Sequence, residues 1–160
     1  MARDVFELSG FKELERVLGE DLPKATSRGV LVRAATKSME PMRRRMGELA
    51  PYDEGDRDGD GNHLRDTMRT QVVRGKIAKS VGGFDRKTGV AVITGPAPVG
   101  KRARDNAGWQ EKGTVKMGAN AYVAPAADAE APTVIANIRG ELALEVEKAV
   151  VRRAKRLGLI

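Results

Sequence analysis

Carboxylates at alternate positions are the residues of this chain whose types and spacing best fit a chemical role. Asp56, Asp58 and Asp60 precede Gly61, which matches the opening of a calcium-binding loop of the D-x-D-x-D-G type. Carboxylates at this spacing can converge on one hard cation, and the glycine permits the turn. The pattern then fails, because Thr67 stands where a calcium loop needs a bidentate glutamate. A calcium site, a solvated acidic loop and an acidic contact surface for a basic neighbour are all open interpretations.

Few residues suit catalysis. His63 is the only histidine, the chain has no cysteine, and no serine lies in a nucleophile elbow. The segment from Gly95 to Lys101 has the spacing of a phosphate-binding loop, but Arg102 follows where serine or threonine would bind magnesium. The sequence therefore predicts a protein that is not an enzyme and that needs no cofactor.

Two groups of cations are candidate contacts for the phosphates of DNA. The first is Arg43, Arg44 and Arg45, and the second includes Arg152 and Arg153 near the C-terminus. Successive helical residues are about 100° apart, so only part of each group can face one partner. The second group also has a structural explanation, because cations at a helix C-terminus offset the macrodipole. We expect weak, salt-dependent backbone contact without base readout.

Composition limits the class of protein. A chain of 160 residues with 41% hydrophobic residues can form one domain, residues 1–160, with a modest core. Aromatic residues make up only 4%, which favours helices packed on a small sheet over an aromatic-rich β-sandwich. The net charge of +7 favours phosphate or acidic protein partners. The absence of cysteine suits a cytoplasmic site of assembly, and no apolar run is long enough to span a membrane.

The elements that must position these residues follow from apolar periodicity. Helical spacing predicts a short helix over residues 11–18 and a longer one over residues 23–49. Pro41 should kink the longer helix, because proline cannot donate the hydrogen bond of the preceding turn. An acidic, glycine-rich exposed loop is expected at 51–62.

The second half of the chain combines strands with one long helix. Apolar residues and alternation predict a hairpin of strands within 64–77 and 90–94. A third short strand, which Trp109 opens, is expected over 109–113. A second exposed loop is expected at 96–107. Apolar residues then recur every three or four positions over 135–157 and predict a long amphipathic helix. The expected class is α+β, with an antiparallel sheet of three to four strands covered by the long helix of the N-terminal half and the C-terminal helix.

The two exposed loops are candidate docking elements, because loops of this length in a small domain often carry function. The first presents the acidic side chains of Asp53 and Glu54. The second presents the cations Lys101, Arg102 and Arg104. We therefore expect contacts with other proteins at both loops.

Four short motifs in a fixed order resemble the tail-component family of siphophages. They are ELAP at 48–51, GNHLRDTM at 61–68, WQEKGT at 109–114 and AYVAPAAD at 121–128. The family shows Ala-Pro, Thr-Gly-x-Leu-Arg-x-Ser, Glu-Phe-Gly-Thr and Pro-Phe-Leu-Arg-Pro-Ala in the same order. This chain departs from it by having Asp60 before Gly61 and Lys112 before Gly113.

The resemblance implies a head-tail connector, tail-completion or tail-terminator-like protein of the virion neck. Such a subunit would form a ring, commonly hexameric, that contacts neighbouring neck or tail proteins and lets genomic DNA pass through its lumen. Trp109, Gly113, Thr114 and Pro125 are the motif residues expected to shape the fold: Gly113 and Thr114 at a sharp bend, and Pro125 at the start of the C-terminal helix. A basic nucleic-acid-binding module and a calcium-dependent interaction domain are the alternatives.

Overall fold

The computed structural model of the protein describes residues 24–73 and 90–156. The described elements are α2 (Lys24–Ser38), α3 (Glu40–Leu49), the 3-10 turn η2 (Leu64–Thr67), β1 (Met68–Val72), β2 (Val92–Pro96), α5 (Lys101–Lys112) and α6 (Val123–Arg156). They form an α+β structure with a small antiparallel sheet and a long C-terminal helix, as the sequence predicts. The short helix predicted over 11–18 lies outside the described residues.

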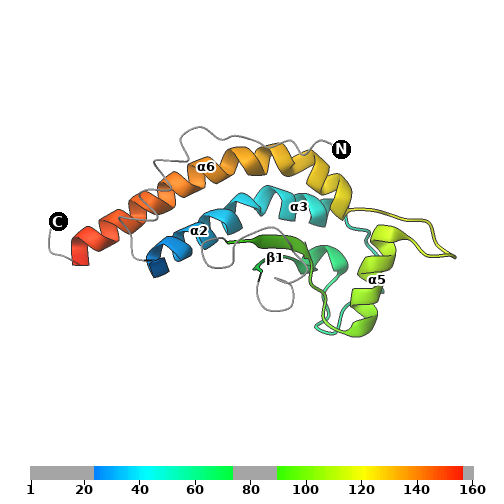
Figure 1. Ribbon diagram of the computed structural model, residues 1–160. Helices are drawn as coiled ribbons and strands as arrows, with labels where there is room; N and C mark the ends of the chain where they lie inside the picture. The colour runs from blue at the N-terminus through cyan, green and yellow to red at the C-terminus, as the bar shows by residue number, and fades with distance from the viewer. Residues whose placement is uncertain (1–23, 74–89, 157–160) are drawn as a thin grey trace.

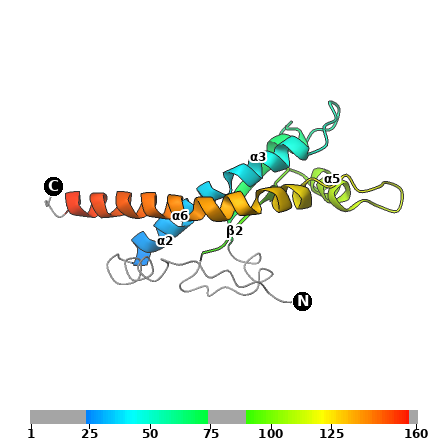
Figure 2. The same ribbon diagram turned by 90° about the horizontal axis from the view of Figure 1, so that it is seen from above.

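The elements are arranged in three tiers, with α2 and α3 in the middle. Figure 1 shows α6 on one side of these two helices and the strands on the other. Figure 2, seen from above, shows that α6 crosses over α2 and α3 at an angle. The C-terminal helix therefore covers the two helices, and these cover the sheet. Near its start α6 also packs against Met68 of β1, while most of its length lies over α2 and α3.

A break at Met39 divides the helix that the sequence predicts over 23–49. Met39 is the N-cap of α3, and Pro41 lies in the first turn of that helix. Proline is tolerated there because the first amides of a helix have no acceptor within the helix. The Oγ atom of Ser38 donates a 2.8 Å hydrogen bond to the carbonyl of Ala34, which keeps this buried hydroxyl satisfied at the break. The helix predicted over 23–49 is thus interrupted two residues before Pro41, near the position where the kink is expected.

The sheet of the described residues has two strands, β1 and β2, in antiparallel register. Thr70 is paired with Thr94, and their hydroxyl oxygens lie 2.8 Å apart. The predicted hairpin strands are thus present, with η2 providing the helical turn before β1. The predicted third strand over 109–113 is wrong, because residues 109–112 are the end of α5 and Gly113 is its C-cap.

Helix α5 also replaces most of the loop predicted at 96–107. Its twelve residues lie between Gly100 and Gly113, whose φ angles of 95° and 75° allow the chain to turn sharply at both ends. Between these glycines the residues are mostly good helix formers, and Ala103 and Ala107 fall one turn apart on the inward face. Because the helix is rich in charged residues and has a single aromatic residue, apolar periodicity does not reveal it.

Two apolar clusters join α6 to the middle tier. Near the start of α6, its buried residues pack with those of α3 and β1; further along, they pack with those of α2. The buried members of the first cluster are Met42, Met46, Ala50, Met68, Tyr122, Ala126 and Val134, and those of the second are Val30, Ala34, Leu142 and Ala149. None of the described helices is both long enough and apolar enough to cross a membrane.

Candidate functional site: the α5 end of the molecule

The Asp58 carboxylate joins the acidic loop to the start of α5. Its Oδ1 atom accepts hydrogen bonds from the backbone amides of Asp60 and Asn62, at 2.9 and 2.8 Å, and its Oδ2 atom accepts one from Val99 at 3.0 Å. The Gly59 amide donates to the Val99 carbonyl at 2.8 Å. These bonds, the one from Val99 foremost, hold the pKa of Asp58 below its usual value. The two segments predicted as separate docking loops are therefore joined to each other.

The three predicted calcium ligands do not form a metal site. The oxygens of Asp58 face backbone amides, Asp56 accepts a hydrogen bond from the side-chain amide of Asn106, and Asp60 is exposed. Across residues 24–73 and 90–156, no three His, Cys, Asp or Glu side chains form a group that could hold a metal ion. The D-x-D-x-D-G segment instead forms a hydrogen-bonded turn. Short acidic side chains and a glycine suit such a turn as well as they suit a calcium loop, so the sequence pattern is the same.

The only histidine of the chain anchors the other end of the acidic loop. His63 is buried, and its Nδ1 atom donates a 3.0 Å hydrogen bond to the carbonyl of Asp53. Its ring packs against Tyr52 with centroids 4.6 Å apart, and the Arg65 guanidinium lies 3.9 Å from the centre of the Tyr52 ring. The contacts of His63 are thus structural. The carboxylate of Asp53 accepts a bond from the Gly55 amide in an exposed turn.

Glu111, the acidic residue of the WQEKGT motif, caps the N-terminus of α6. Its two carboxylate oxygens accept hydrogen bonds from the backbone amides of Tyr122, Val123 and Ala124 at 2.8, 2.8 and 3.0 Å. Burial raises the pKa of Glu111, but the three amides outweigh burial and the net shift is downward. A carboxylate on one helix therefore satisfies amides that have no acceptor within the first turn of the second helix.

Tyr122 completes the junction between α5 and α6. Its side chain is fully buried, and its hydroxyl donates a 3.3 Å hydrogen bond to the carbonyl of Ala107 on α5. Burial, together with the nearby negative charge of Glu111, raises the pKa of Tyr122 to about 12. Pro125 lies in the first turn of α6, two residues after the helix begins at Val123, where proline is tolerated.

The chain between α5 and α6 forms a loop that projects from the end of the molecule (Figure 1). A Cβ atom on Gly113 would lie 2.8 Å from the amide nitrogen of Ala119 and 2.9 Å from the carbonyl oxygen of Met117, so only glycine fits. The Oγ1 atom of Thr114 accepts bonds from the amides of Lys116 and Met117, at 3.2 and 3.1 Å. The bend expected at Gly113 and Thr114 is therefore present, and it shapes the protruding loop, residues 113–121.

An open pocket of about 260 Å³ lies between the acidic loop and α5. Carboxylates, side-chain amides and one phenol supply its polar lining. The lining residues are Pro51, Tyr52, Asp53, Asp56, Leu64, Asn106, Gln110 and Asn120.

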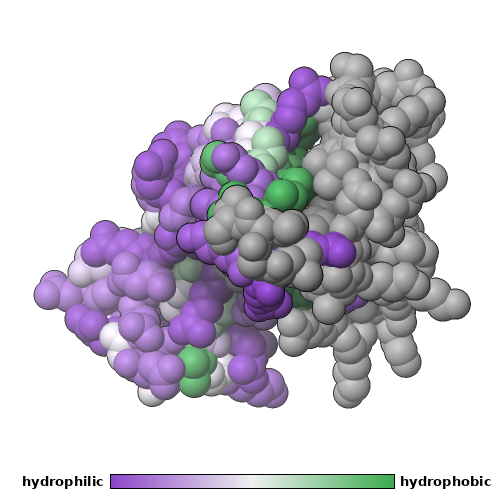
Figure 3. All heavy atoms as spheres, turned by 90° about the vertical axis from the view of Figure 1, so that its left-hand side faces the viewer, coloured by the Kyte–Doolittle hydropathy of each residue, from purple (hydrophilic) through white to green (hydrophobic). Residues whose placement is uncertain are grey.

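The predicted DNA-contacting arginines of α3 are paired within their own helix. Arg43 forms an ion pair with Glu40, and Glu48 lies 3.8 Å from Arg44 and 3.0 Å from Arg45. At the other end of the molecule, Arg152 donates a 3.0 Å hydrogen bond to the carbonyl of Lys148. Figure 3, seen from that end, shows a hydrophilic surface interrupted by hydrophobic patches. The structure therefore separates the two groups of cations and does not bring them together into one surface.

Sequence reasoning missed Glu145, the buried acid between α2 and α6. Its carboxylate lies 2.5 Å from Nε of Arg33 and 2.7 Å from Nζ of Lys37, and only 3% of the residue is exposed. Hydrogen bonds from Arg33 and Lys37 lower the pKa of Glu145 to about 2. The signal was present in the sequence, since Glu145 is three residues after Leu142 and four before Ala149 on the apolar stripe of the helix.

No protein-family model, no curated protein and no solved structure matches this chain. The α5 end carries the motif residues, the acidic loop, the pocket and the protruding loop.

Proposed function

We propose that this protein is a structural subunit of a tailed-bacteriophage neck, forming a ring that completes the tail or joins it to the head. The observation that carries the proposal is the meeting of all four resemblance motifs at one junction. The first, second and fourth motifs contribute Ala50, Met68 and Tyr122 to the same buried cluster. The third motif joins them through the bonds of Glu111 to the start of α6.

This convergence gives the motifs one structural purpose. A set of unrelated turn and cap signals would have no reason to share a core cluster, whereas the signature of one fold should do so. Trp109 is a partial exception, because its side chain is 48% exposed on α5 and contributes nothing to that core.

Exposed apolar side chains support assembly with copies of the same chain. Val115 and Met117 lie on the protruding loop, and α6 exposes Leu144, Val150 and Val151 along its length. An elongated subunit that docks through an end onto a different surface of the next copy closes into a ring when the rotation between copies permits it. We propose a hexamer, in which the protruding loop contacts the neighbouring copy.

A ring of this kind would also define the sheet edge, the location and the neighbours of the subunit. Pairing of the sheet edge with another copy would join the two strands of each copy into a sheet of four strands. The ring would lie in the virion, assembled in the host cytoplasm, with neck and tail proteins as neighbours and DNA passing through the lumen. Its role is structural and not enzymatic.

Light scattering combined with negative-stain imaging tests the ring. The wild-type chain should form a ring with a central hole, and the double substitution Val115→Asp with Met117→Asp should reduce it to monomers. Ala129→Asp is the matched control, because this exposed position of α6 already lies between Asp128 and Glu130. A wild-type chain that stays monomeric up to millimolar concentration contradicts the ring, and a ring unaffected by the double substitution contradicts the role of the loop.

A further inference from the structure

The outward face of α5 is cationic. At about 100° per residue, Lys101, Arg102, Arg104 and Lys112 fall on an outward arc of roughly 160°, which Asp105, Gly108 and Trp109 share. All seven residues are exposed, and the opposite arc carries the residues that face the molecule, among them Ala107. Four cations thus share this face with a single carboxylate.

These cations lack the partners that the other groups have. The arginines of α3 are paired with Glu40 and Glu48. By contrast, Lys101, Arg102 and Arg104 form no ion pair within the described part of the chain. Among residues 24–73 and 90–156, no carboxylate is therefore paired with these three cations.

Helix electrostatics also fails to explain these cations. The basic residues that end α6 offset the negative end of its macrodipole, which is a sufficient structural reason for them. Lys101, Arg102 and Arg104 lie in the first turn and at the next position of α5, where the macrodipole disfavours positive charge, and no acidic residue compensates in that turn. Charges placed against local stability indicate a role in recognition.

An exposed aromatic ring lies on the same face. Trp109, the only tryptophan of the chain, is 48% exposed. The neighbouring Gly108 has no atom within 4 Å of the position that a Cβ would occupy, so the surface beside it is open. Lys112 lies one turn after Trp109, and Arg102 lies about two turns before it on the same face. Cations and an accessible indole on one face form the combination that binds a sugar-phosphate backbone and stacks an unpaired base.

We propose that the outward face of α5 binds single-stranded nucleic acid, with its cations contacting phosphates and a base stacked on Trp109. The exposed indole favours a single strand over a duplex, whose bases are already stacked on one another. This binding site goes beyond the ring proposal and does not depend on it, since either a monomer or a ring can present α5.

A binding titration of the full chain with labelled oligothymidylate tests the site. Fluorescence anisotropy gives the affinity, and quenching of Trp109 reports contact at the proposed face. The triple substitution K101E/R102E/R104E should weaken binding at least tenfold. It should also reduce the slope of the logarithm of the affinity against the logarithm of the salt concentration by about 2. Each phosphate contact to a single strand contributes roughly 0.7 to this slope, and the variant loses three such contacts. Trp109→Leu should weaken binding by about tenfold.

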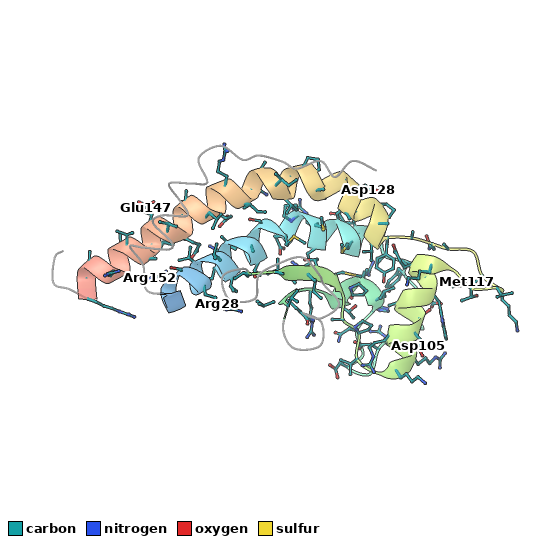
Figure 4. All side chains as sticks on the ribbon, in the orientation of Figure 1. Arg28, Asp105, Met117, Asp128, Glu147 and Arg152 are labelled. Atoms are coloured by element: carbon teal, nitrogen blue, oxygen red, sulfur yellow. The ribbon has the colours of Figure 1, made fainter. Side chains whose placement is uncertain are left out.

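The matched control is R152E/K155E/R156E, which makes the same change of formal charge at the far end of α6. Figure 4 shows Arg152 and Asp105 at opposite ends of the molecule. The control should change the affinity less than threefold. Equal losses in the two triple variants would show attraction by net charge alone and would overturn the site. The site would also be overturned if duplex DNA or polyglutamate bound as tightly as oligothymidylate. The same holds if the fluorescence of Trp109 were not quenched on binding. Both outcomes count whatever the oligomeric state of the protein.

Discussion

The Oε2 atom of Glu111 lies 2.8 Å from the backbone nitrogen of Tyr122, and this contact ties the end of α5 to the start of α6. Replacing Glu111 with glutamine removes the charge that binds three amides. We expect the free energy of unfolding to fall by about 1–2 kcal/mol, measured by denaturant titration. Glu147→Gln on the exposed side of α6 is the control and should change it by less than about 0.5 kcal/mol. Equal stability of the two variants would contradict the capping role.

The buried carboxylate of Glu145 should make stability depend on pH. Because its folded-state pKa is depressed to about 2, its stabilisation is present above the unfolded-state pKa near 4.5 and is lost as pH falls toward 2. Glu145→Gln should lower the free energy of unfolding at neutral pH by roughly 1–3 kcal/mol, discounted for the partial exposure of Arg33 and Lys37. Acid titration of unfolding should then be flatter between pH 4.5 and 2 for the variant than for the wild type. Parallel curves would refute this.

Two glycines of the same region should respond to alanine in opposite directions. Gly113 has a φ of 75° and no room for a Cβ, so Gly113→Ala should destabilise the fold by more than about 1 kcal/mol. Gly108 is helical and has open space around it, so Gly108→Ala should stabilise by about 0.5–1 kcal/mol. Thermal unfolding of the pair provides the measurement, and shifts of the same sign would be inconsistent with the structure.

Asp58 should control the mobility of the acidic loop. Asp58→Ala removes the acceptor for the amides of Val99 and Asn62, so hydrogen exchange at both amides should accelerate. Asp60→Ala is the control, because the side chain of Asp60 is exposed and should leave the Val99 amide protected. Because folding lowers the pKa of Asp58, the carboxylate stays charged in the wild type until the pH falls below the unfolded-state pKa near 3.8. Faster exchange of the Val99 and Asn62 amides in the wild type should therefore appear only below that pH. Unchanged exchange in Asp58→Ala would argue against the anchoring role.

The long helices were predictable from sequence because their apolar faces repeat over many turns. The break at Met39 followed from Pro41, whose conformational restriction is local. Helix α5 was missed because its buried side consists of alanines and polar residues, which give almost no hydropathy signal. A strand is expected over 109–113 because an aromatic residue favours strands, but only a single apolar residue lies in that segment.

The candidate site was predictable only in part. The motif residues Gly113 and Thr114 lie at the expected bend, because their conformational requirement is encoded locally. The hydrogen bonds of Asp58 to Val99 and of Glu111 to Val123 join segments that are distant in sequence or lie in different elements. The spacing of Asp56, Asp58 and Asp60 fits both a metal loop and a hydrogen-bonded turn. Only the three-dimensional positions of their carboxylates distinguish the two.

The pairing of α2 with α6 has a consequence for how the chain is made. Glu145 contacts Arg33 across a separation of 112 residues, and the buried apolar residues of α2 have their partners on α6. During translation, α2 and α3 therefore leave the ribosome with Val30, Ala34 and Met46 uncovered until α6 follows. A chain that ends before α6 would leave these apolar residues uncovered and should aggregate more readily than the full chain.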